Sequence, residues 1–109
     1  MDMNPNARLS IVAYRPKPGK EQELMALTRE HVPYLRNAGL ATGRPHVIAT
    51  ASDGTVIEVF EWVEGGLARA HGHAGLRTMW ERYAAACDYV PLNTLPETAM
   101  MFANFVPAD

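Results

Sequence analysis

The histidines of this chain are its best-placed residues for acid–base chemistry. His71 and His73 lie close together in a glycine-rich stretch. An imidazole, with an ordinary pKa of about 6.5, can take a phenolic proton at neutral pH. We therefore predict His71 as the first candidate for a catalytic base and His73 as the second. Structural alternatives stay open: His71 is exposed or bonded to a neighbouring carbonyl group, and His73 caps the helix that follows it.

The His-x-His spacing also raises the question of a metal ion. Residues two positions apart do not share a face of a helix, so His71 and His73 would point in different directions. No carboxylate partner stands nearby in the sequence. The sequence therefore predicts no metal site.

Two further polar residues are predicted to lie on buried surfaces. His31 falls at the centre of the apolar stripe of a predicted helix, where it either serves the core or lines a ligand pocket. Glu58 alternates with apolar residues of a predicted strand, and a buried carboxylate is costly unless it is paired. Glu58 is either a functional group or half of an ion pair across a dimer interface, and we favour the ion pair.

Four aromatic residues are candidates for holding an aromatic ligand: Phe60, Trp62, Trp80 and Tyr83. Their rings can stack on a ligand, although aromatic residues at such spacing also fill a hydrophobic core. Cys87 lies among alanines with no activating base beside it, which predicts an inert, packed thiol.

Composition bounds the class of protein. A length of 109 residues suits one domain, spanning residues 1–109. The net charge of −2 argues against a nucleic-acid partner, which requires a basic surface. No stretch approaches the roughly 18 apolar residues of a membrane span, and the first residues lack a signal-peptide pattern. We expect a soluble, cytoplasmic protein.

Hydrophobic periodicity and turn residues predict the elements that must position these side chains. Residues 1–7 are expected to form a loose tail, and residues 88–99 a surface loop. A helix over 20–38 carries Pro33 on its solvent side, and Gly72 divides a second helical region into segments over 66–71 and 74–87. Asp53-Gly54 predicts a hairpin turn. Strands are expected over 9–14, 44–51, 55–63 and 100–106.

This order, β-α-β-β-α-β, is the ferredoxin-like pattern of an α+β protein. It predicts a four-stranded antiparallel sheet with two helices on one face. The strands over 9–14, 55–63 and 100–106 carry apolar residues on both faces, although the helices cover only one. An uncovered apolar face is usually an interface, so we expect a homodimer in which two sheets pack face to face.

Three stretches carry a resemblance to a known family. These are EWVEGGLARAH, with Trp62 nine residues before His71, Pro18-Gly19-Lys20 at the start of the first helix, and the ending LPETAMMFANF. Over residues 8–107 the chain resembles antibiotic biosynthesis monooxygenase-like proteins of the dimeric α/β-barrel superfamily. The resemblance implies a homodimer with a cavity between helices and sheet. It also implies oxygenase activity on quinols or polyketide phenols without a cofactor.

The same superfamily includes haem-degrading enzymes, which use an asparagine and a Trp/His pair. The resemblance places Val12, His71 and Glu81 at those positions, so haem degradation is not expected. We expect a small cofactor-independent monooxygenase acting on an aromatic or quinol substrate. The alternative is a non-catalytic dimer of the same fold that binds a small apolar or aromatic molecule.

Overall fold

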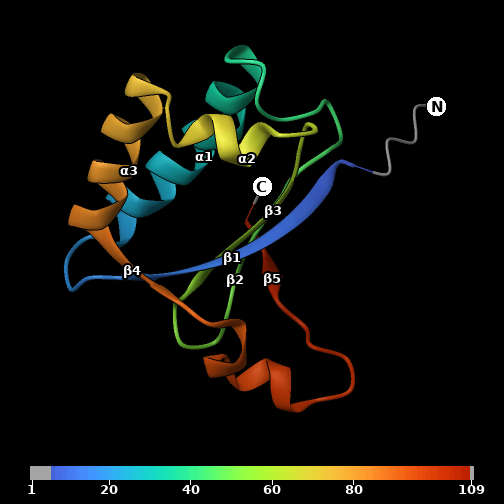
Figure 1. Cartoon of the computed structure of the whole chain (residues 1–109). Helices are drawn as coiled ribbons and strands as arrows, with labels where there is room; N and C mark the ends of the chain where they lie inside the picture. The colour runs from blue at the N-terminus through green and yellow to red at the C-terminus, as the bar shows by residue number, and fades with distance from the viewer. Residues whose placement is uncertain (1–5, 109) are drawn as a thin grey trace.

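The computed structural model describes residues 6–108, which form an α+β arrangement of helices packed on one sheet (Figure 1). Residues 1–5 of the predicted tail lie outside the described residues. The elements in chain order are β1 (Arg8–Pro16), α1 (Glu21–Asn37), β2 (Val47–Thr50), β3 (Val56–Trp62), α2 (Gly66–Ala70), α3 (Ala74–Ala86), β4 (Cys87–Val90), two short 3-10 helices (Leu92–Thr94 and Pro96–Ala99) and β5 (Val106–Pro107).

Within residues 6–108 the sheet has five strands in the order β4-β1-β3-β2-β5, and every neighbouring pair is antiparallel. The prediction of four strands is therefore corrected to five. In the central pair, Arg8 lies opposite Trp62 and Val12 lies opposite Glu58. This register sets which side chains share a face, and the candidate site depends on it.

The strand predicted over 100–106 is wrong, since only Val106–Pro107 pairs with β2. Met101 and Phe102 are 94% and 76% exposed, because their apolar run finds no strand to pair with. The edge strand that pairs with β1 is β4, which begins at Cys87 where α3 ends. Part of the loop predicted over 88–99 is thus strand, and the rest is mostly the two 3-10 helices.

The predicted stripe of α1 is confirmed. Its buried residues are Leu24, Leu27, Thr28, His31, Val32 and Leu35. Pro33 lies inside the helix on its exposed side. The carbonyl group that its absent N–H leaves unpaired therefore faces solvent, and the helix continues to Asn37.

The predicted division of the second helical region is also confirmed. Helix α2 ends at Ala70, the chain turns through His71 and Gly72, and α3 begins at Ala74. Residues Gly66–Ala70 and Ala74–Ala86 can therefore point their side chains in independent directions. In α3 the buried residues are Leu76, Met79, Tyr83 and Ala86, which form its inner face.

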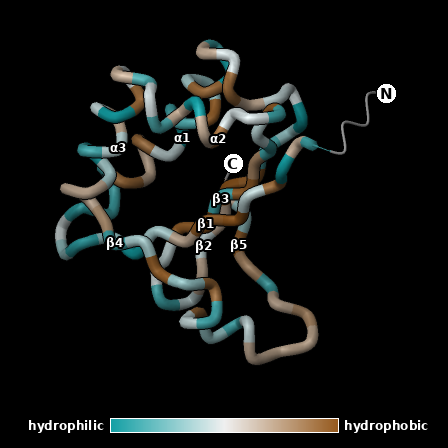
Figure 2. Tube along the Cα trace, viewed as in Figure 1, coloured by the Kyte–Doolittle hydropathy of each residue, from teal (hydrophilic) through white to brown (hydrophobic). Residues whose placement is uncertain are grey.

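Helices α1, α2 and α3 lie on one side of the sheet, and the chain after β4 passes on the other (Figure 1). Most of the core lies between helices and sheet, and apolar residues are concentrated in β1 and β3 (Figure 2). A smaller cluster on the outer face packs Leu95 against Ala13, Ala51 and Ile57.

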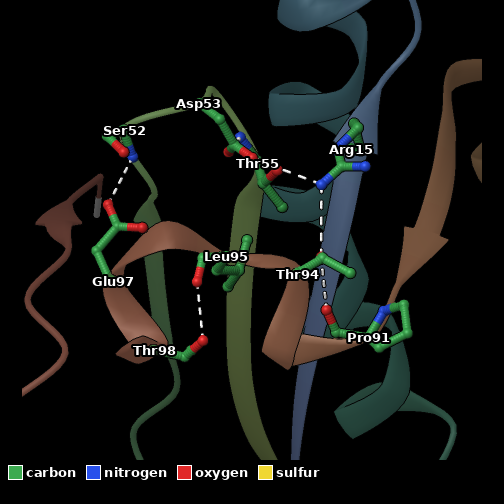
Figure 3. A network of polar contacts seen from close by, with 9 residues as sticks. All are labelled: Arg15, Ser52, Asp53, Thr55, Pro91, Thr94, Leu95, Glu97 and Thr98. Atoms are coloured by element: carbon green, nitrogen blue, oxygen red, sulfur yellow. Dashed lines mark hydrogen bonds and ion pairs between the residues drawn. The ribbon is translucent and has the colours of Figure 1, made fainter. Parts of the chain in front are cut away.

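Polar contacts hold the segment after β4 against the β2–β3 hairpin (Figure 3). The Ser52 amide donates to Glu97 at 2.7 Å, which lowers the pKa of that carboxyl group. Arg15 contacts Asp53 at 3.5 Å and Thr94 at 3.4 Å. Because these contacts position Leu95, part of the outer sheet face is covered by the chain itself.

No helix in the described part of the chain has the length and apolar character needed to cross a bilayer.

Candidate functional site

A cavity of about 330 Å³ lies between the inner face of β1 and β3 and the three helices. Five of the residues predicted for the site line it: His31, Phe60, Trp62, His71 and Trp80. The remaining lining residues are Ser10, Val12, Tyr14, Leu67 and Tyr89. The walls are thus mainly aromatic and apolar, with a few polar groups that can orient a ligand.

One buried polar residue of the cavity is His31, which α1 presents toward β3. Its Nδ1 lies 2.8 Å from Oε1 of Glu58, and the Tyr14 hydroxyl donates to the same oxygen at 2.7 Å. Glu58 is fully buried and His31 is 3% exposed. Tyr14, Glu58 and His31 therefore form a buried polar network that joins β1, β3 and α1.

This network corrects the expectation for Glu58. The favoured ion pair across a dimer interface is wrong, because Glu58 lies on the face that the helices cover and pairs with His31 of its own chain. Burial of a carboxylate is offset here by two hydrogen bonds to one oxygen.

The network also orients the His31 imidazole. Burial, followed by the charge of Glu58, raises the pKa of Tyr14 far above its usual value, so this phenol keeps its proton and acts as a donor. Glu58 Oε1 accepts a hydrogen bond from Tyr14, and it accepts a second one from His31 when Nδ1 of His31 carries a proton. Nε2 then presents its lone pair.

Nε2 of His31 is buried and has no hydrogen-bond partner among the described residues. A carboxylate that binds Nδ1 stabilises the imidazolium formed when Nε2 takes a proton. The site therefore has the parts of a general base: a histidine that lines the cavity, and a carboxylate fixed against its Nδ1.

The aromatic wall beside His31 comes from alternate residues of β3. The His31 and Phe60 rings meet edge to face at 5.5 Å, and the Phe60 and Trp62 ring centroids are 4.9 Å apart. The Trp62 indole donates to Ser10 Oγ at 2.9 Å, which fixes its ring against β1. A flat ligand would meet rigid, oriented rings in this wall.

His71 lies at the mouth of the cavity rather than in its depth. The break at Gly72 allows His71 to turn toward Trp80, and their ring centroids lie 5.2 Å apart. His71 is exposed, whereas Trp80 is half-buried. His71 thus lines the cavity but remains in contact with solvent.

His73 and Tyr83 are not among the residues that line the cavity. His73 is the N-cap of α3, and its Nδ1 accepts a hydrogen bond from the Leu76 amide at 3.1 Å. Of its two predicted roles, the structure shows the capping one. Tyr83 is fully buried behind the wall, with its ring stacked on Tyr14 at 4.7 Å.

A second hollow, of about 440 Å³, adjoins the cavity at the end of β3. It shares four lining residues with the cavity: Ser10, Trp62, Leu67 and His71. Its other lining residues are Asn6, Arg8, Val63, Gly65, Gly66 and Ala68. These four residues therefore border both spaces.

The sequence also raised the reactivity of Cys87 and the question of a metal ion. Cys87 is buried, and burial raises its pKa to about 11, which makes its thiol a poor nucleophile. Among the described residues, no group of three or more His, Cys, Asp and Glu side chains is arranged to hold a metal ion.

Sequence reasoning missed Tyr14, Ser10, Leu67 and Tyr89 as lining residues, and it missed the partners of Glu58. Ser10 and Tyr14 alternate along β1, which is a signal for one shared face. That signal does not reveal the strand opposite, which only the pairing of Val12 with Glu58 supplies.

Comparison with known proteins adds no assignment, since no protein-family model, curated protein or solved structure matches the chain.

Proposed function

We propose that this protein is a small enzyme that removes a proton from an aromatic hydroxyl compound and promotes its reaction with O2. The observation that carries the proposal is His31, which lines an aromatic cavity and has Glu58 hydrogen-bonded to its Nδ1, while its Nε2 is buried with no hydrogen-bond partner among the described residues. The class is that of a cofactor-independent monooxygenase of the antibiotic biosynthesis monooxygenase type.

In this proposal the base is His31 rather than His71. A general base works best where water is excluded and its geometry is fixed. His31 meets both conditions, since it is 3% exposed and bound to Glu58 at 2.8 Å. His71 is exposed at the mouth, where it can guide the substrate or close over it.

The chemistry assigned to the chain is binding, orientation and proton transfer. Phe60, Trp62 and Trp80 hold the substrate ring, and His31 Nε2 takes the hydroxyl proton while Glu58 stabilises the imidazolium. The electron-rich phenolate then reduces O2. Overall, a phenol with a free ring position and O2 give a quinone and water. One oxygen atom enters as a carbonyl, the other leaves as water, and the substrate supplies all the electrons.

The wider architecture supports the same class. The adjacent strands β4-β1-β3-β2, with the helices on one face, fit a ferredoxin-like arrangement to which β5 is added. We also propose a homodimer through the outer sheet face. There Leu9, Ile11 and Val47 are 58%, 50% and 46% exposed, which is unusual for aligned apolar strand residues. Sedimentation as a stable monomer at micromolar concentration would refute the dimer.

The function is tested by screening phenols and quinols for O2 uptake by the purified protein after treatment with a chelator. We expect uptake with at least one planar phenol, accompanied by the absorbance of the quinone product. The His31→Gln variant should lose about 10²–10⁴-fold of the rate while remaining folded. Tight binding of phenols without any O2 uptake would instead support a non-catalytic ligand-binding protein.

A further inference from the structure

We propose that Ser10 selects the substrate by donating a hydrogen bond to a neutral carbonyl group on its aromatic ring system. This inference rests on the proposed function in one respect: the same molecule directs its hydroxyl group to His31. The ligand class is then a planar phenol that carries a ketone or a similar carbonyl group at the far end of its rings.

The Ser10 hydroxyl group has a donor that the protein leaves unused. The Trp62 indole Nε1–H donates to Ser10 Oγ at 2.9 Å, and this is the hydrogen bond that the Ser10 side chain makes within residues 6–108. A serine hydroxyl group also carries one proton of its own to donate. Because Ser10 and Trp62 both line the cavity, a ligand bound there can supply the acceptor.

The contact with Trp62 prepares Ser10 for this role. A hydroxyl group that accepts one hydrogen bond is polarised, and it donates the next one more strongly. Trp62 is 5% exposed, and its ring packs against Phe60 with centroids 4.9 Å apart. Ser10 Oγ is therefore held in place before a ligand arrives, which lowers the entropic cost of binding.

The strand register sets the spacing between Ser10 and the base. Ser10 lies opposite Phe60, whereas Val12, the next residue of β1 on the same face, lies opposite Glu58. Two residues of strand correspond to roughly 7 Å. Since Glu58 binds His31, the donor and the base are separated along the sheet by about the length of two fused aromatic rings.

The lining of the cavity favours a neutral acceptor over an anion. None of the described residues that line it is a lysine, arginine, aspartate or glutamate. A carboxylate would lose its hydration there without meeting a permanent positive charge, whereas one hydrogen bond is enough for a ketone. Ser10 supplies that bond, and the aromatic rings of the wall supply the remaining contact surface.

The test compares two naphthols that differ in the carbonyl group. One carries an acetyl group at the end of the ring system opposite the hydroxyl group, and the other carries an ethyl group at the same position. Their dissociation constants are measured by calorimetry for the native protein, Ser10→Ala, Ser10→Thr and Ser52→Ala. Threonine keeps the hydroxyl group and suits a strand. Ser52 is exposed in the β2–β3 turn and does not line the cavity, so Ser52→Ala is a matched control for the loss of one serine hydroxyl group.

The quantity compared is the ratio of the two dissociation constants, from which a general loss of affinity cancels. We expect Ser10→Ala to shift this ratio against the acetyl compound by about three- to tenfold relative to the native protein. Ser10→Thr and Ser52→Ala should keep the native ratio. An unchanged ratio in Ser10→Ala, or a Ser10→Thr variant that behaves like Ser10→Ala, would overturn the inference.

Infrared spectra of the bound acetyl compound give a second readout. The carbonyl stretching band should lie at lower wavenumber in the native complex than in the Ser10→Ala complex, and equal positions would count against the hydrogen bond. Neither assay needs turnover. Carbonyl-selective binding without O2 uptake would refute the proposed function alone, whereas O2 uptake with a ratio that does not depend on Ser10 would refute this inference alone.

Discussion

Removing one hydroxyl group tests whether the buried network at Glu58 stabilises the fold as the contacts indicate. In Tyr14→Phe the ring remains, and with it the stacking on Tyr83 at 4.7 Å and the edge contact with Tyr89 at 5.3 Å. What is lost is the 2.7 Å hydrogen bond to Glu58. Oε2 of this carboxylate already has no hydrogen-bond partner among the described residues, so Oε1 would keep His31 alone.

The expected cost follows from the type of bond. A hydrogen bond to a charged group contributes about 1.5–3 kcal/mol to stability, and its loss leaves the carboxylate less well satisfied. For a chain of this size that corresponds to a fall in Tm of roughly 6–12 °C. Thermal and urea unfolding followed by circular dichroism measure both quantities.

Tyr34→Phe is the matched control for this experiment. Tyr34 lies on α1, is half-buried and packs edge to face on His73, but its hydroxyl group has no hydrogen-bond partner among the described residues. Its substitution should change the free energy of unfolding by less than about 0.5 kcal/mol. If Tyr14→Phe were as stable as Tyr34→Phe, the assignment of Tyr14 as a donor to a buried carboxylate would be refuted.

Three other outcomes are expected. Glu97→Gln should lower the free energy of unfolding at neutral pH but not at about pH 2–3. The Ser52 amide lowers the pKa of Glu97 from 4.5. The stabilisation from the Glu97 carboxylate is therefore present above pH 4.5 and is lost as the pH falls through the lowered pKa. Equal effects at both pH values would contradict this. The buried Cys87 thiol, with a pKa of about 11, should react with a disulfide reagent at mildly alkaline pH only after denaturation, and rapid reaction of the native protein would count against its packing. Trp80→Ala should cost about 2 kcal/mol, less than Leu76→Ala, because Trp80 is half-buried and Leu76 is fully buried; the reverse order in urea unfolding would show that the orientation of α3 is wrong.

Local sequence signals predicted the parts of the fold that depend on neighbouring residues. The stripe of α1 follows from helical periodicity, and it correctly placed His31 on the inner face. Asp53 and Gly54 form the predicted turn, where Asp53 accepts from the Thr55 amide and Gly54 has φ 89°. Gly72 ends α2 as predicted.

The misplaced strand has a different cause. Hydrophobicity alone predicted a strand over residues 100–106. The edge strand that pairs with β1 is instead the short β4, which begins at Cys87. Pairing depends on where a strand can reach a partner. The chain leaving α3 lies directly beside β1, so four residues with only modest β character are enough to pair there.

The polar network could not be predicted for a related reason. Tyr14, His31 and Glu58 lie 17 or more positions apart in the sequence, and their meeting requires both the β1–β3 register and the position of α1 on the sheet. The cost of burying Glu58 indicated that it needs a partner. Which partner it finds is set by tertiary structure.

The central claim is that His31 presents Nε2 to an aromatic hydroxyl ligand while Glu58 holds Nδ1. Imidazole nitrogen NMR of the isotope-labelled protein tests it most directly, with spectra recorded before and after addition of a naphthol. We predict that His31 carries its proton on Nδ1, and that the ligand shifts the Nε2 signal of His31 strongly while His73, the helix cap, changes little. The claim would be contradicted if His31 carried its proton on Nε2 in the protein without ligand. It would also be contradicted if the naphthol shifted only the imidazole signals of the exposed His71.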